Sequence, residues 1–264
     1  MLIKKHQNPT NLGCWCFLIN RIFKFEAFFS DEEKINTKLF FNKYSEYSLL
    51  LLDQTKKFEE TDDYLNYGKK IKQVIEEYKI DIKYVSDLID SISNGKKYEE
   101  FKYIPEPIKL EFYITLLLYL CYGENYTIKP NYKSDSFGLP ISQAPGKIGD
   151  IEVFSEMVYW LVEVTLMRNR NQQLNNETSN VVRHLNTSDK ETYLSLVAPV
   201  IHEDTKTFYD NQIIGFLNKN KRVSIKGFEI NEFKQVVISK NALEIMKAYT
   251  DDYLSMTKKN LGLL

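Results

Sequence analysis

The sequence predicts an α/β fold, in which a sheet flanked by helices follows a helical N-terminal segment. Apolar residues alternate with polar ones along 158–166, as expected for a strand with one buried face. Residues 111–122 are apolar nearly all round, as in a buried helix. Residues 37–93 carry apolar side chains three and four positions apart, which indicates amphipathic helices.

The composition is that of a folded protein. Hydrophobic residues make up 43% and charged residues 27% of the 264 positions, enough to bury a substantial core. The formal net charge of -1 gives no overall basic field, so unaided affinity for nucleic acid should be modest.

The cysteines and the apolar segments indicate the redox compartment and whether the chain enters a membrane. Three cysteines, the first two spaced as Cys-x-Cys, form neither a disulfide framework nor a metal-binding spacing, so a reducing cytoplasm is expected. The most apolar stretch, 112–122, is much shorter than the roughly 20 residues that span a bilayer, and no membrane partner is expected.

The N-terminal part is expected to be a separate helical subdomain. We place it at residues 1–100, because Asn94-Gly95 is a helix-stop signal, and expect it to contact a partner or DNA. The second domain then covers residues 101–264. It opens with Pro105 and Pro107, which suit a helix start.

That first helix contains one anomalous residue. Glu111 stands among apolar residues, where an isolated carboxylate is costly, so it lies either at the exposed helix start or facing a metal. Residues 126–130 then predict a short strand, and 131–147 a loop rich in proline and glycine.

The stretch 149–185 carries the chemistry. Asp150 opens an apolar run at 151–154, and a hairpin turn at 155–157 leads into the alternating strand, where Glu163 and Thr165 share the face opposite the apolar one. A tight hairpin would place the two carboxylates side by side. Because such carboxylates repel, they predict a divalent cation, and oxygen ligands suit Mg²⁺.

A polar helix is predicted after Arg168. Gln173, Glu177 and His184 follow one another at spacings of four and seven, which puts all three on one helix face toward the same sheet edge. Taken singly, the strand carboxylates and the helix residues each have an ordinary explanation. Carboxylates in a strand often face solvent, and a row of polar residues on a helix usually lies on the protein surface.

The remaining elements are shorter predictions. Residues 193–201 indicate a third strand that ends at Pro199, and Asp204 or Thr205 either caps the following helix or belongs to the site. A short strand at 222–225 and an amphipathic helix at 242–254 close the chain.

Several motifs in one order resemble a known family. They are GLPISQAP at 138–145, GDIEV at 149–153, LVEVTLMRNRNQ at 161–172 and RHL at 183–185. Together they resemble the AlwI-type restriction endonucleases of the PD-(D/E)XK nuclease superfamily. The resemblance implies a restriction-endonuclease-like core with a mixed central sheet. It also implies type IIS activity of a restriction-modification system: Mg²⁺-dependent cleavage of double-stranded DNA near an asymmetric site, with Mn²⁺ as a substitute.

The resemblance also implies residue roles. Asp150 and Glu163 match the paired metal ligands, with the Val164 carbonyl completing the shell and Glu111 binding the metal through water. Glu177 and His184 match polar positions that orient water or contact the phosphate. Thr165 stands where the superfamily usually has a catalytic Lys, so that Gln173, His184 or Lys147 would supply the donor. The candidates for DNA contacts are Lys147, Arg168 and Arg183.

Two further expectations follow from length and charge. Members of this family are usually longer, so the chain is expected to be a cleavage subunit that needs a separate recognition subunit, or a second copy for double-strand cleavage. One rival is a non-catalytic DNA-binding or assembly subunit. Another is a metal-free glycosidase using paired carboxylates, disfavoured because Trp15 and Trp160 are the only tryptophans.

Overall fold

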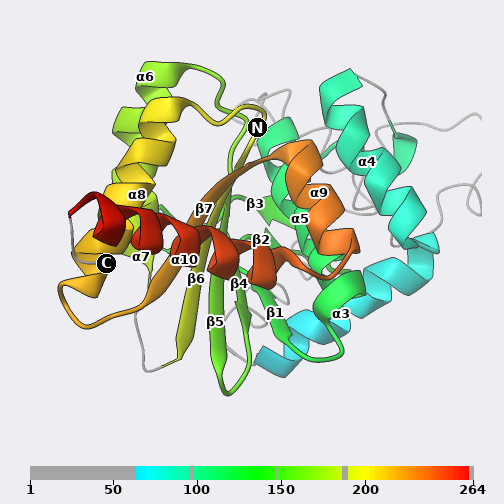
Figure 1. Cartoon of the computed structure of the whole chain (residues 1–264). Coiled ribbons are helices and arrows are strands. Elements are labelled where there is room, and N and C mark those ends of the chain that lie inside the picture. The colour runs from blue at the N-terminus through cyan, green and yellow to red at the C-terminus, as the bar shows by residue number, and fades with distance from the viewer. Residues whose placement is uncertain (1–63, 95–97, 147, 186–189, 262–264) are drawn as a thin grey trace, which may run out of the picture. The chain divides into compact units, whose positions relative to one another are not determined.

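A computed structural model describes residues 64–94, 98–146, 148–185 and 190–261 (Figure 1). By its internal contacts the chain divides into two units, residues 1–62 with 99–103 and residues 63–98 with 104–264. The 3-10 turn η3 (Glu99–Phe101) falls in the first unit, and every other described element falls in the second. What the sequence predicts before residue 64 lies outside the described residues.

The predicted boundary at residue 100 differs from this division. The helices α3 (Tyr64–Tyr78) and α4 (Ile82–Asn94) confirm the helical pattern of their segment, but they belong to the unit that holds the sheet. Among the described residues, no helix is long and apolar enough to cross a membrane.

The central sheet is mixed, as predicted. Its five strands lie in the order β1-β4-β5-β6-β7, with antiparallel pairing from β1 to β5 and parallel pairing from β5 to β7. The strands are β1 (Thr127–Pro130), β4 (Ile151–Phe154), β5 (Val158–Val164), β6 (Glu191–Ala198) and β7 (Val223–Glu229). β6 ends one residue before Pro199, which has no N–H to donate to a ladder.

The hairpin between β4 and β5 sets the register of the site. Ser155 closes the turn by donating its N–H to the Val158 carbonyl at 2.9 Å. Pairing then runs along the strands to Ile151 opposite Val162. The next opposed positions are Asp150 and Glu163, so the predicted approach of these carboxylates follows from the register.

Helices cover both faces of the sheet. The helices α5 (Glu106–Tyr122) and α9 (Ile230–Ile238) cover one face, where Trp160 packs against Tyr122 and Phe233. On the other face Leu161 joins a core cluster with residues of α7 (Ser179–His184) and α8 (Glu203–Leu217). The helix α10 (Ala242–Asn260) packs against β7 and contacts both α8 and α9 (Figure 1).

The predicted loop at 131–147 contains a small hairpin. The strands β2 (Lys133–Ser134) and β3 (Pro140–Ser142) pair across a turn in which Asp135 Oδ1 accepts from the N–H groups of Phe137 and Leu139. Gly138 has a φ of +88°, which favours glycine. Strands of two and three residues are too short for the alternating pattern that identifies a strand.

The helix predicted after Arg168 is interrupted. A single turn, α6 (Arg170–Gln172), leads into a π-helical segment, η4 (Gln173–Thr178), before α7 begins. Because a π-helix closes its hydrogen bonds one residue later than an α-helix, spacings of four and seven no longer keep side chains on one face.

Neither residue proposed to cap α8 does so. The N-cap position is His202, which makes no side-chain cap hydrogen bond. The side chain of Asp204 binds Arg170, and Thr205 Oγ1 donates to Gln173 Oε1 at 2.9 Å.

Candidate active site

Three carboxylates from different elements line one cleft of about 530 Å³. Asp150 precedes β4, Glu163 lies near the end of β5, and Glu111 comes from the first half of α5. The lining also includes His184, Thr165 and the backbone of the loop before Gly149. The hairpin and α5 therefore bring together the acidic residues that the sequence singles out.

The main chain around Asp150 is tightly held. The side-chain Oδ2 of Asp150 accepts a hydrogen bond from the Val164 N–H at 2.7 Å, which ties the start of β4 to the end of β5 at the site. Asn131 Nδ2 donates to the Gly149 carbonyl at 2.7 Å, and the Asn131 N–H donates to the Asp150 carbonyl at 2.8 Å. Burial, then the charges of Glu163 and Glu111, raise the pKa of Asp150 well above its ordinary value.

Glu163 is paired with the last residue of α7. Its Oε1 lies 2.8 Å from His184 Nδ1, and the carboxylate is 6% exposed. The hydrogen bond to Glu163 is the main reason that the pKa of His184 is raised, and the Gly146 backbone adds to it. Through this contact His184 holds the Glu163 carboxylate in place.

Gly149 allows the Glu163 side chain to approach. A Cβ at this position would lie 2.8 Å from Glu163 Oε1 and 2.3 Å from Leu161 Cδ1. This position therefore needs a residue without a side chain, because Leu161 and Glu163 occupy that space.

Glu111 is the least satisfied of the three carboxylates. It is 5% exposed, and within the described part of the chain its Oε2 is buried without a hydrogen-bond partner. Burial and the charge of Glu163 raise the pKa of Glu111 to about 7, although a hydrogen bond from the Ala144 backbone acts in the opposite direction. Of the two sequence interpretations, the exposed helix start does not hold.

These residues fit a divalent cation with few protein ligands. Among the residues that the structure describes, no three His, Cys, Asp or Glu side chains already surround a common point as a finished metal centre does. The unpartnered Glu111 oxygen nevertheless favours a cation here, as do the pKa values of Glu111 and Asp150, which burial and then neighbouring carboxylates raise. Mg²⁺ suits such a donor set, because it binds through one or two carboxylates and keeps several waters.

Other predicted catalytic residues are placed as follows. Thr165 lines the cleft, and its Oγ1 accepts from the Met167 N–H at 3.2 Å. Glu177 lies in η4, but its side chain is outside what the structure describes. Lys147 is also outside the described residues.

Gln173 is not brought to the cleft. Its side chain is fully buried, where Nε2 donates to the Val200 carbonyl at 2.8 Å and Oε1 accepts from the His202 N–H at 3.1 Å and from Thr205. The predicted single polar face is therefore wrong in its geometry, because η4 rotates Gln173 away from the side that carries His184.

The predicted DNA-binding arginines lie outside the cleft lining. Arg168 and Arg183 are both exposed, and the Arg168 carbonyl contacts His202 Nε2 at 2.9 Å. Of the described residues that line the cleft, none is Lys or Arg. The cleft as described therefore carries three carboxylates and a histidine, which is unfavourable for a phosphodiester without added cations.

Sequence reasoning missed three residues at the site. Gln143 and Gln172 are exposed amides in the cleft lining, and Asn131 holds the backbone before β4. Gln143 and Gln172 fall inside the motifs GLPISQAP and LVEVTLMRNRNQ, which was a usable signal. Asn131 had no such signal, because its role depends on the pairing of β1 with β4.

Comparisons with known proteins give one family match and similarity to a solved structure. The model of the AlwI restriction endonuclease family matches residues 32–236, well over half of the chain. Among solved structures, the small subunit of the heterodimeric restriction endonuclease R.BspD6I is similar at 23% identity. The match covers 66% of this chain and 98% of that one, with a TM-score of 0.47. The comparison with curated proteins finds no match.

Proposed function

Because the chain belongs to the AlwI restriction endonuclease family, we propose that it is a Mg²⁺-dependent DNA endonuclease of a restriction-modification system. The proposal is carried by one observation: Glu111, Asp150 and Glu163 line one cleft, where one Glu111 oxygen is unpartnered and where burial and then neighbouring carboxylates raise the pKa values of Glu111 and Asp150. Such a cluster is suited to a cation that a phosphate substrate also contacts.

The residues that would hold the metal are those of the cluster. Asp150 and Glu163 would bind directly, the Val164 carbonyl would complete the protein ligands, and Glu111 would act through water. When bound, Mg²⁺ supplies positive charge to the phosphate oxygens and lowers the pKa of water, and Mn²⁺ would substitute. The net reaction adds water across a phosphorus–oxygen bond, with the hydroxyl going to phosphorus and the proton to the leaving oxygen.

The protein's own groups orient this reaction. His184 fixes Glu163 through the contact at 2.8 Å, and its Nδ1 therefore faces the carboxylate. Thr165 stands where the usual Lys would be and offers a neutral hydroxyl, so donors to the phosphate would come from Gln143 and Gln172 in the lining. Neutral donors stabilise negative charge less than Lys does, which increases the need for the metal.

The proposed function includes a partner. No described lining residue is Lys or Arg, and the chain's net charge is -1, so phosphate contacts must be supplemented. We infer that a separate recognition subunit, or a second copy of this chain, provides them on double-stranded DNA in the cytoplasm. On this proposal, cleavage near an asymmetric site, as in a type IIS enzyme, would be directed by that partner.

Cleavage of supercoiled plasmid by the purified protein tests the proposal. Mg²⁺ should support nicking, EDTA should abolish it, and Glu163→Gln should reduce it by at least about 100-fold, as expected for loss of a metal ligand. Calorimetry with Mn²⁺ gives a second readout on both proteins. Metal binding without any cleavage would favour the second candidate, a non-catalytic DNA-binding or assembly subunit.

A further inference from the structure

A second concave site lies away from the acidic cleft, at the start of β6 and β7. It has a volume of about 320 Å³, and its lining carries four basic side chains and one carboxylate. We define this basic bowl by its charged lining residues: Lys190, Glu191, Lys221, Arg222 and Lys247. In a chain whose net charge is -1, such a concentration of positive charge is local and specific.

The bowl and the cleft lie at opposite ends of the parallel strands. Glu163 is paired with Leu196 near the end of β6, whereas Glu191 is the first residue of that strand. Five strand residues at about 3.3 Å each separate these positions by roughly 16 Å. A single phosphate group bound in the cleft therefore cannot also fill the bowl, whereas a duplex of several base pairs is long enough to span this distance.

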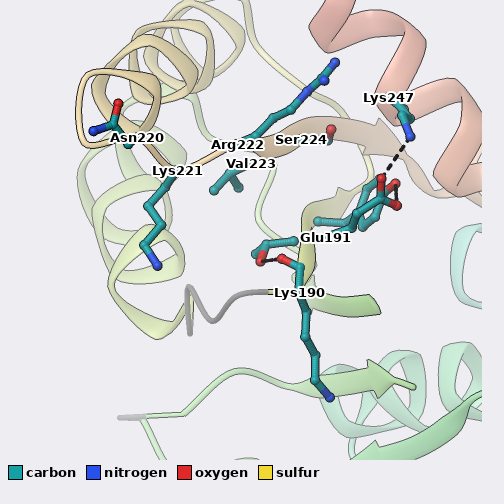
Figure 2. A pocket seen from close by; sticks show the side chains of 10 residues that line it. Lys190, Glu191, Asn220, Lys221, Arg222, Val223, Ser224 and Lys247 are labelled. Carbon is teal, nitrogen blue, oxygen red and sulfur yellow. Dashed lines mark hydrogen bonds and ion pairs between the residues drawn. The ribbon is translucent and has the colours of Figure 1, made fainter. Parts of the chain in front are cut away.

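The basic side chains spread around the rim of the bowl. Figure 2 shows Lys190, Lys221 and Arg222 pointing in different directions, while Lys247 reaches toward Glu191, to which it is bonded at 2.9 Å. Cations that diverge in this way do not converge on one small anion. They match a series of phosphates along a nucleic-acid backbone, where charges are closely spaced.

The existing ion pairs at the rim are exchangeable. Arg222 pairs with Asp251 at side-chain exposures of 60% and 47%, and Lys247 pairs with Glu191 at 47% and 55%. Pairs this exposed are largely screened by solvent and stabilise the fold little. A phosphodiester can therefore replace the carboxylates without disturbing a buried network.

We propose that the basic bowl binds the phosphodiester backbone of duplex DNA, as a contact separate from the acidic cleft. The contact is independent of sequence, because it reads phosphates and no base edge. It goes beyond the proposed endonuclease activity, since it requires neither the metal nor the carboxylates. It would add a phosphate contact roughly 16 Å along the strands from the cleft.

Duplex binding by the full chain in EDTA tests the proposal without any cleavage. Lys221→Glu should weaken the Kd for a labelled duplex, measured by fluorescence anisotropy, by at least about fivefold, and should lower the slope of log K against log salt by about one. Lys219→Glu is the matched control, because Lys219 is exposed two residues earlier and does not line the bowl. Because its side chain is not part of the bowl, it should change the Kd clearly less than Lys221→Glu does. Lys221→Gln, which only removes the charge, should give an intermediate loss.

Several outcomes would overturn the proposal. Equal losses for Lys221→Glu and Lys219→Glu would mean that only the general surface charge matters. Inorganic phosphate that displaces the duplex more than chloride at equal ionic strength would identify a small-anion pocket. Polyglutamate that binds in a Lys221-dependent way, with no binding of duplex, would identify a surface for an acidic protein partner. The contrast between the two variants should persist with Glu163→Gln, so failure of the endonuclease proposal is distinguishable.

Discussion

At the scale of single residues, the three carboxylates are stable together only when something compensates their charge. Glu111 shows this most directly, because burial and Glu163 raise its pKa to about 7. Without a metal the protein can compensate by binding protons, and on the proposed function a bound cation would take their place. Stability in EDTA should therefore depend on pH in a way that reports on this cluster.

The first prediction concerns that pH dependence. A carboxyl whose pKa rises from 4.5 unfolded to about 7 folded binds more protons in the folded state between these values, so stability falls as pH rises through them. The raised pKa values of Asp150 and His184 act in the same direction. Urea unfolding in EDTA should therefore give a lower free energy of unfolding at alkaline pH than at acidic pH.

Glu111→Gln should remove much of this dependence. At alkaline pH in EDTA it should stabilise the protein by ~1–3 kcal/mol, because a neutral amide replaces a buried charge. Glu124→Gln, at an exposed carboxylate just beyond α5, is the control and should leave the pH profile unchanged. An unchanged profile in Glu111→Gln would mean that this carboxylate is solvated in solution.

A second prediction concerns Gly149. Gly149→Ala would place a methyl group 2.8 Å from Glu163 Oε1 and 2.3 Å from Leu161 Cδ1, so one of these side chains must move. We expect a loss of about 1–3 kcal/mol in unfolding free energy and loss of the Glu163–His184 pair. Gly146→Ala is the control for stability, because the added Cβ would have no neighbouring atom within 4 Å. Unfolding in urea and the NMR titration of His184 report the two effects; a His184 titration unchanged in Gly149→Ala would contradict the role of Gly149.

At the scale of elements, the π-helical segment η4 explains how the polar stretch from α6 to α7 both packs into the core and contributes to the cleft. Gln173 at its start faces inward and ties η4 to the turn between β6 and α8. His184, at the end of α7, faces the cleft and holds Glu163. The extra residue in the π-helical turn changes the direction of the side chains that follow, so that Gln173 points into the core and His184 points into the cleft.

Gln173→Ala tests this structural role. The substitution leaves the Val200 carbonyl and the Thr205 hydroxyl without their buried partner, which should cost about 2–4 kcal/mol in unfolding free energy. Gln172→Ala, at an exposed neighbour, should stay within about 0.5 kcal/mol. The midpoints of urea unfolding, compared at an unchanged denaturant slope, measure the loss of stability in both variants. Equal midpoints for the two variants would show that the Gln173 hydrogen bonds do not stabilise the fold.

Local patterns predicted the elements that carry the carboxylates. The alternation in β5, the short run of β4 and the apolar composition of α5 were each readable, and the hairpin length implied that Asp150 and Glu163 meet. The break in the polar helix was not readable, because a π-turn leaves no distinct composition and its residues still fit a 3.6 period. The partners of Gln173 lie about 30 residues later, and only the folded chain brings them together.

At the scale of the whole molecule, charge is divided between the two ends of the parallel strands. The described residues place carboxylates at the end of β5 and the basic bowl at the start of β6 and β7. On the two proposals above, the acidic end would bind a cation and the basic end would bind phosphates.

The last prediction follows from the number of catalytic centres. On the proposed function, the acidic cluster of the described residues is one catalytic centre, and one centre hydrolyses one strand at a time, so the protein alone should nick a plasmid before it linearises it. With protein below the concentration of plasmid, nicked circles should accumulate first. Linear product should then rise more steeply than in proportion to protein, because a second copy must act on the opposite strand. The ratio of linear to nicked DNA across a protein titration measures this. Linear product that appears without a nicked intermediate under those conditions would contradict a single centre per chain and indicate a preformed assembly with two.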